Sequence, residues 1–259
     1  MDYNLHTHTK RCHHASGEAE DYVLAAIKGG MRVYGFSDHV PQQFPDGRES
    51  GYRVPMAEGA AYCEEIRALR EKYKDKIDIR IGFELEYYPL YFEQMLRNAI
   101  GFGAEYLILG QHFIHNEHPG GRYVINPHNE KEHLLVYVDT VIEAIRTGVF
   151  TYVAHPDIFQ YNIHAPEYEE SMRRLCVAAR ENSTPLEINF LGIRDKRIYP
   201  NTVFWKIAGE EKAPVTFGLD AHQTEDACDR ASLAIAQSLV EKYKLNYIGM
   251  PKIIDIRSL

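Results

Sequence analysis

Histidine stands out in this chain of 259 residues. Several of the 13 histidines lie close in the sequence to another histidine or to a carboxylate, and both residue types bind metals. His6 and His8 are two positions apart, and so are Asp220 and His222. Alternate side chains on extended backbone point to the same side, so each pair can face one ion or two neighbouring ions. Neutral imidazole suits zinc, iron and manganese, and carboxylates add charge that such ions require. The spacing therefore predicts a site for divalent metals.

Strands that could position these residues alternate with helices along the whole chain. Apolar and β-branched runs predict strands at 2–6, 33–38, 77–84, 106–112, 150–155, 185–190 and 215–220, with a weaker eighth at 246–250. Helical spacing predicts helices at 17–28, 56–73, 90–100, 129–147, 167–182, 201–211 and 224–243. This alternation favours a parallel α/β barrel in one domain, residues 1–259. An open doubly wound sheet is the alternative, but no glycine-rich phosphate-binding motif follows any strand.

The candidate ligands fall at the ends of the predicted strands. Besides the two pairs, His39, Glu84, His112 and His155 each end a strand. The active sites of barrel enzymes lie at the C-terminal ends of the strands, so these side chains should meet at one rim. Asp38 and Glu86 end strands as well, and we expect them to orient neighbouring histidines.

Six motifs in chain order resemble those of the PHP (polymerase and histidinol phosphatase) domain family. They are HTHTKRCHH (6–14), GFSDHVP (35–41), IGFELEY (81–87), LGQHFIH (109–115), VAHPD (153–157) and FGLDAH (217–222). The second motif is similar to the form found in histidinol-phosphate phosphatases. The resemblance implies a distorted (β/α)7 TIM-like barrel with a metal site at the C-terminal rim of the strands.

The resemblance also implies two to three divalent ions, zinc, manganese or iron, and it assigns their ligands. The first ion would be held by His6, His8, Glu84 and Asp220. Glu84 would bridge to the second ion, which His112 and His155 complete. The third ion would be held by His14, His39 and His222, with His13 as the alternative to His14.

The function implied by the resemblance is metal-dependent hydrolysis of a phosphomonoester. The expected substrate is L-histidinol phosphate, converted to L-histidinol and phosphate in histidine biosynthesis. Asp220, His222 and Arg194 are the candidate catalytic residues. One alternative is a phosphoesterase acting on another small phosphate ester or a nucleotide. A non-catalytic metal-binding module is another, although a degenerate module would be expected to lose ligands.

Basic side chains near the predicted rim could bind the phosphate. Arg194 and Arg197 follow the sixth predicted strand, and an arginine fork matches phosphate oxygens in two places. Arg53 and His115 are further candidates for substrate contact, on the loops after the second and fourth predicted strands.

The composition limits the partners that we expect. With 37 acidic and 29 basic residues, the chain has a net charge of −8, which does not predict a basic face for nucleic acid. The four cysteines are scattered, and the first residues lack the apolar stretch of a signal peptide. We therefore expect a cytoplasmic protein that has no membrane segment and acts on a small phosphorylated substrate.

Overall fold

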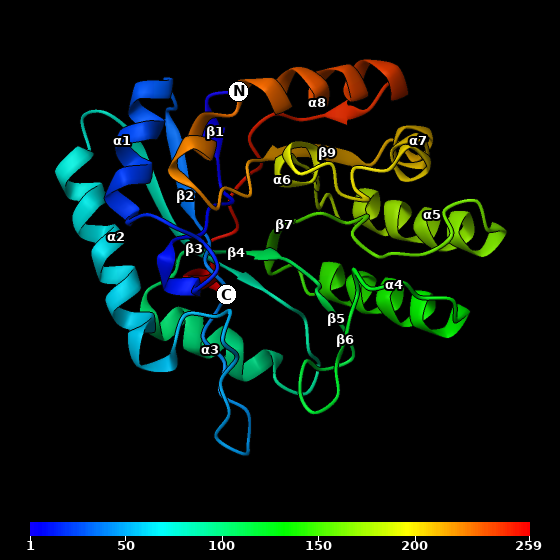
Figure 1. Ribbon diagram of the computed structural model, residues 1–259, viewed down its shortest axis with the longest axis horizontal. Helices are drawn as coiled ribbons and strands as arrows, with labels where there is room; N and C mark the ends of the chain where they lie inside the picture. Colours follow the sequence, from blue (N-terminus) through cyan, green and yellow to red (C-terminus); the bar gives the residue numbers. More distant parts are fainter.

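The computed structural model describes residues 1–259 and shows a curled parallel sheet surrounded by helices (Figure 1). The sheet has eight strands in the order β1-β2-β3-β4-β7-β8-β9-β10. Their bounds are Tyr3–Asn4 (β1), Val33–Phe36 (β2), Asp78–Leu85 (β3), Tyr106–Leu109 (β4), Phe150–Val153 (β7), Leu186–Asn189 (β8), Pro214–Gly218 (β9) and Asn246–Tyr247 (β10).

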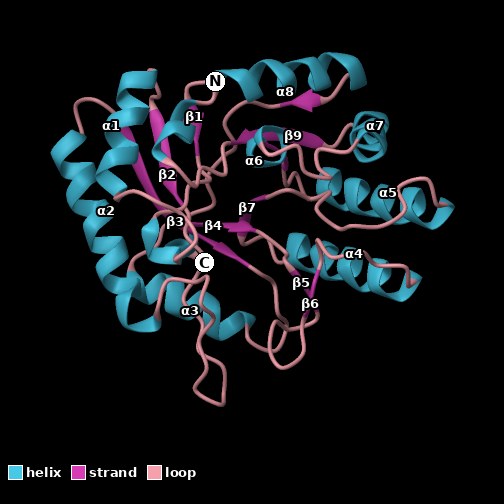
Figure 2. Ribbon diagram, viewed as in Figure 1, coloured by secondary structure: helices cyan, strands magenta, loops and turns pink.

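Helices connect successive strands and form an outer ring around them (Figure 2). They are α1 (Ala19–Gly29), α2 (Gly59–Tyr73), α3 (Phe92–Phe102), α4 (Lys131–Arg146), α5 (Pro166–Glu181), α6 (Phe190–Arg194), α7 (Thr202–Glu211) and α8 (Arg230–Tyr243). Short 3-10 helices occupy Lys10–Cys12, Met56–Glu58, Thr224–Cys228 and Ile256–Ser258. Side chains define several helix starts: Asn201 accepts a hydrogen bond from Phe204 N at the start of α7, and Asp229 accepts one from Ser232 N at the start of α8.

The sheet closes on itself at the C-terminal ends of its strands. Thr7, after β1, pairs with Ala221, after β9, and His8 N donates to Ala221 O at 2.9 Å. At the opposite end of the barrel β10 pairs with the start of β9, and the Tyr3 and Tyr247 hydroxyls lie 3.1 Å apart. The predicted TIM-like α/β barrel is confirmed, and the weak eighth strand predicted at 246–250 is present as β10.

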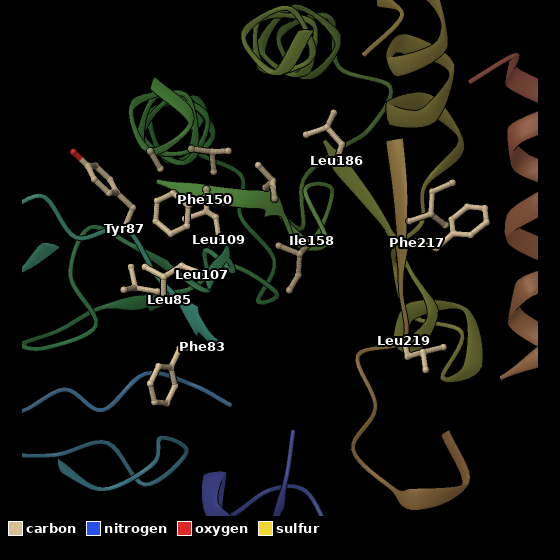
Figure 3. Close-up of a cluster of buried hydrophobic side chains, with 14 of the residues drawn as sticks. Phe83, Leu85, Tyr87, Leu107, Leu109, Phe150, Ile158, Leu186, Phe217 and Leu219 are labelled. Atoms are coloured by element: carbon tan, nitrogen blue, oxygen red, sulfur yellow. The ribbon is translucent and has the colours of Figure 1, made fainter. Parts of the chain in front are cut away.

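Strict alternation along the strands separates the apolar core from the barrel interior. On β3, Phe83 and Leu85 pack toward the helices, together with Leu107 and Leu109 of β4 (Figure 3). The residue between the first two, Glu84, points to the other side, into the barrel. Deep in the interior, a small apolar cluster of Leu5, Tyr106, Ile108, Tyr152 and Ala154 fills the space. The polar strand ends therefore lie above a packed floor.

Three short elements were not predicted from the sequence. A hairpin of β5 (Phe113–Ile114) and β6 (Arg122–Tyr123) follows β4, and the short helix α6 follows β8. Elements this short carry too few residues to show a periodic pattern. None of the helices has both the length and the apolar character needed to cross a bilayer.

Candidate metal centre

Glu84 lies at the centre of a buried group of imidazoles. Its Oε2 is 3.5 Å from His6 Nε2 and 3.3 Å from His8 Nε2. Asp220, just after β9, places Oδ1 3.4 Å from each of the same two nitrogens. All four side chains are buried. Two imidazole nitrogens and two carboxylate oxygens that converge in this way suit a divalent metal.

The second oxygen of Glu84 faces a different pair of imidazoles. Oε1 lies 3.0 Å from His155 Nε2 and 3.6 Å from His112 Nε2. These histidines follow β7 and β4, and β4 lies between β3 and β7 in the sheet. A carboxylate whose two oxygens face separate groups of donors is placed to bridge two ions.

Three more histidines lie together beside the first group. The ring centroid of His14 is 5.2 Å from that of His39 and 4.9 Å from that of His222. Nδ1 of His14 donates to the Cys12 carbonyl at 2.8 Å, and Nδ1 of His222 donates to the Asp220 carbonyl at 3.1 Å. Nε2 of His222 is therefore left for a ligand, and Nε2 of His14 has only a long contact of 3.9 Å with Cys12 Sγ. The group can accommodate a third ion held by imidazoles.

The neighbouring histidines lie elsewhere. His13 is exposed, and its Nδ1 donates to Gly51 O at 3.2 Å, on the surface. His14 is exposed as well, but it lines the cavity above the site. His115, an expected substrate contact, is exposed in the turn after β5 and does not line this cavity.

Unsatisfied polar atoms support the fit of these residues to metal ions. His6 Nε2 and Asp220 Oδ1 are both buried, and neither has a hydrogen-bond partner. Buried polar atoms are normally paired, so two such atoms facing one another require an explanation. A cation between them would satisfy both.

Charge in the centre shifts the pKa values of its members in opposite directions. Burial lowers the pKa of His6, but the carboxylates of Asp220, Glu187 and Glu84 outweigh burial and raise it to about 10. Burial raises the pKa of Glu84, but nearby imidazoles, His39 foremost, hold it well below its usual range. In the metal-free protein, His6 is therefore positively charged near neutral pH while Glu84 is negatively charged.

Further carboxylates hold the outer nitrogens of the candidate ligands. Nδ1 of His6 donates to Glu187 Oε1 at 2.9 Å, and Nδ1 of His112 donates to Glu86 Oε1 at 2.8 Å. Asp38 lies 3.7 Å from His8 Nδ1 and accepts hydrogen bonds from Thr9. The hydrogen bonds to Glu187 and Glu86 fix which nitrogen of His6 and His112 faces the centre, as outer partners of metal-binding histidines commonly do.

Glu187 and Asn189 of β8 belong to this network, although the sequence analysis did not single them out. Oε2 of Glu187 accepts from His155 N at 3.1 Å and from Asn189 Nδ2 at 2.8 Å. Asn189 Nδ2 also donates to Asp220 Oδ2 at 3.0 Å. Polar residues two apart in an otherwise apolar run were the signal that could have identified this pair.

The backbone is strained at two of the candidate ligands. His155 has a φ of 30° and Asp220 a φ of 46°, values that residues other than glycine rarely adopt. Surrounding contacts maintain both conformations: Glu187 accepts from His155 N, and Arg194 donates to the carbonyls of Leu219 and Asp220. Such strain is concentrated at functional sites.

Glycines in the adjacent strands make room for the two innermost glutamates. A Cβ on Gly110 would lie 1.8 Å from Glu84 Oε1, and a Cβ on Gly218 would lie 1.7 Å from Glu187 Oε1. No heavy atom can approach another so closely, so each glycine is required for its glutamate to lie across the neighbouring strand.

A cavity of about 820 Å³ opens above the centre. Its lining combines candidate ligands, aromatic rings and two of the three predicted arginines: His8, His14, His39, Tyr52, Glu84, His112, Phe113, Tyr123, His155, Ile158, Leu191, Arg194, Asp195, Arg197, Tyr199, Asp220, His222, Gln223 and Asp226. Besides the two carbonyls that it contacts, the Arg194 guanidinium lies 3.2 Å from Asp229. Arg197 is held by Asp195 and by the Tyr199 hydroxyl.

Arg53 does not line this cavity, which differs from the expectation that it contacts substrate. Its side chain is 1% exposed, because Glu86 and Glu117 enclose its guanidinium.

Comparisons with known proteins identify the family of the chain and related sequences. The PHP domain family model matches residues 4–190. A Deinococcus radiodurans protein named "Probable histidinol-phosphatase" is 26% identical over 239 residues, 90% of each chain. The Bacillus subtilis histidinol-phosphatase is 26% identical over 255 residues, 85% of this chain and 93% of the relative.

A solved structure shares the fold. The histidinol phosphate phosphatase of Lactococcus lactis, crystallised with zinc, L-histidinol and phosphate, superposes with a TM-score of 0.71 at 18% identity. The alignment covers 99% of this chain and 97% of that one.

Gly110→Ala should displace Glu84 and weaken metal binding. The new methyl group would occupy the position of Oε1, so we expect the affinity for zinc to fall at least about tenfold. Competition with a chromophoric chelator measures this affinity. Gly101→Ala, a change in α3 with open space around it, is the control and should bind as the unaltered protein does. Equal zinc affinity in both variants would contradict the position assigned to Glu84.

Metal uptake should release protons. Because the pKa of His6 is about 10 without metal, its imidazole must lose a proton before it can bind an ion at pH 8. Zinc affinity should therefore rise with pH up to about that value. Calorimetric titration in two buffers of different ionisation enthalpy measures the number of protons released. A heat that does not depend on the buffer would contradict the charged state inferred for His6.

Proposed function

The chain belongs to the PHP domain family, and we propose that it is a metal-dependent phosphomonoester hydrolase acting on L-histidinol phosphate. The products would be L-histidinol and inorganic phosphate, a step of histidine biosynthesis. The observation that carries this proposal is Glu84, whose two oxygens face separate groups of imidazoles at the floor of a cavity. The histidinol-phosphatase names of the two relatives support the substrate.

We propose that the three groups of ligands hold two to three divalent ions. His6, His8, Glu84 and Asp220 would form the first group, Glu84, His112 and His155 the second, and His14, His39 and His222 the third. Zinc, manganese and iron all suit these donors, and the zinc in the Lactococcus lactis structure favours zinc. Bound divalent ions polarise phosphoryl oxygens and lower the pKa of water.

The phosphate would be oriented by arginines at the cavity wall. Arg194 and Arg197 both line the cavity, and neighbouring groups hold each guanidinium in place before a substrate arrives. Neighbouring groups occupy most of the Arg194 N–H donors, and a remaining N–H can donate to a phosphate oxygen. This is positioning and charge neutralisation, which is most of what phosphoryl transfer requires.

Asp220 and His222 would serve as unprotonated metal ligands, and neither holds a proton to donate. Burial raises the pKa of Asp220, but the imidazoles around it, His6 foremost, hold it well below its usual range. Burial and the neighbouring His8 lower the pKa of His222 to about 3. Both groups are therefore unprotonated at neutral pH. The proton that the leaving alkoxide needs would come from another source.

The rest of the cavity suits an aromatic, positively charged alcohol. Tyr52, Phe113 and Tyr123 line one side, and an imidazole ring can pack against such rings. Asp195 and Asp226 lie on the wall near the arginines, and a carboxylate there could pair with an ammonium group. Both features match histidinol better than a neutral sugar.

The test is hydrolysis of a panel of phosphomonoesters by the metal-loaded protein. We expect kcat/KM to be highest for L-histidinol phosphate and expect chelation to abolish turnover. Arg194→Ala should lower kcat/KM by about 10- to 150-fold, the usual cost of losing one charge-assisted contact.

Arg80→Ala is the matched control, because Arg80 pairs with Asp78 at the far end of β3. It should leave kcat/KM unchanged. Failure to hydrolyse any phosphomonoester despite bound metal would refute the proposed function. If activity is highest on a nucleotide, the protein is still a phosphatase, but its proposed substrate is wrong.

A further inference from the structure

We infer that Arg53 is a positioning residue, which holds the candidate metal ligand His112 in place through Glu86. The inference rests on the proposed metal centre and extends it to a residue outside the cavity.

Arg53 is almost completely enclosed by its partners. Its guanidinium lies 2.6 Å from Glu86 Oε2 and 2.5 Å from Glu117 Oε2, and Nη1 donates to Val40 O at 3.2 Å. The Tyr52 hydroxyl is 3.0 Å from Nη2. A buried arginine that makes these contacts is not available to a phosphate in the cavity.

The contact with Glu86 leads directly to the metal centre. Oε2 of Glu86 accepts from Arg53, and Oε1 accepts from Nδ1 of His112 at 2.8 Å. His112 then presents Nε2 toward Glu84 Oε1. The orientation of the His112 ring therefore depends on where Glu86 is held.

Charge explains why a guanidinium is needed at this position. Glu86 is fully buried, and so is Glu84, two residues away on the same side of β3. Two buried carboxylates this close repel one another unless a cation compensates. The Arg53 guanidinium supplies such a cation 2.6 Å from Glu86 Oε2, while Glu86 Oε1 accepts from His112 Nδ1.

Glu117 provides a comparison within the same cluster. It belongs to the segment between β5 and β6 and shares the Arg53 guanidinium with Glu86. It holds Arg53 from the other side and has no contact with His112. The inferred path from Arg53 to His112 runs through Glu86.

The experiment compares zinc affinity and steady-state kinetics among Arg53→Lys, Glu86→Gln, Glu117→Gln and the unaltered protein. Arg53→Lys keeps the charge but loses the fork, and Glu86→Gln keeps the shape but loses the charge. Both should weaken zinc binding by about 10- to 100-fold, the range typical of outer partners of metal ligands. They should lower kcat more than they change KM. Glu117→Gln should have a much smaller effect on zinc affinity.

Three results would overturn the inference. Unchanged zinc affinity with a raised KM in Arg53→Lys would make Arg53 a substrate contact. Equal losses of affinity in Glu117→Gln and Glu86→Gln would exclude the path through Glu86. Unchanged zinc affinity in Glu86→Gln would also exclude a path through Glu86. If Arg53→Lys does not fold, the zinc affinity of Glu86→Gln tests the inference instead. If the unaltered protein binds no zinc, the proposed metal centre is refuted as well. If every variant binds zinc normally, only the role of Arg53 is refuted.

Discussion

Buried negative charge at one end of the barrel is the constraint on which the rest of the site depends. Asp38, Glu84, Glu86, Glu187 and Asp220 are all buried there, and Arg53 is the one buried guanidinium among them. Moving ionised carboxylates out of water is costly unless cations or hydrogen bonds compensate. Without metal, protonated imidazoles such as His6 supply part of the positive charge. Divalent ions held by the same imidazoles and carboxylates would supply it more fully.

The barrel makes this concentration of charge possible. Alternation along each strand lets Phe83 and Leu85 contribute to the apolar core while Glu84 between them reaches the interior. The same rule places Glu187 inside, between Leu186 and Ile188 of β8. The cost of the polar residues is thus confined to one face, and the apolar layer around the barrel stabilises the fold.

The strand ends and their metal-binding residues could be predicted from the sequence because both depend on local patterns. Each strand is a short apolar run, and a parallel barrel brings the ends of all strands to one rim wherever the residues lie in the chain. The neighbours of those side chains depend on the tertiary structure. Arg53 and Glu117 are 64 residues apart, and no local pattern joins them. The requirement for glycine at position 110 could not be predicted either, because it depends on the position of the Glu84 side chain in the folded structure. Glu187 could have been found, because a glutamate two positions before Asn189 interrupts an apolar run.

We propose that Glu84 would bridge two ions, and anomalous diffraction from crystals grown with zinc tests this proposal most directly. The account predicts one anomalous peak near Oε2, among His6, His8 and Asp220, and another near Oε1, beside His112 and His155. The two peaks should lie about 3.5–4 Å apart, the separation typical of two-metal sites. A single peak, or peaks that contact one oxygen of Glu84 and leave the other free, would contradict the account.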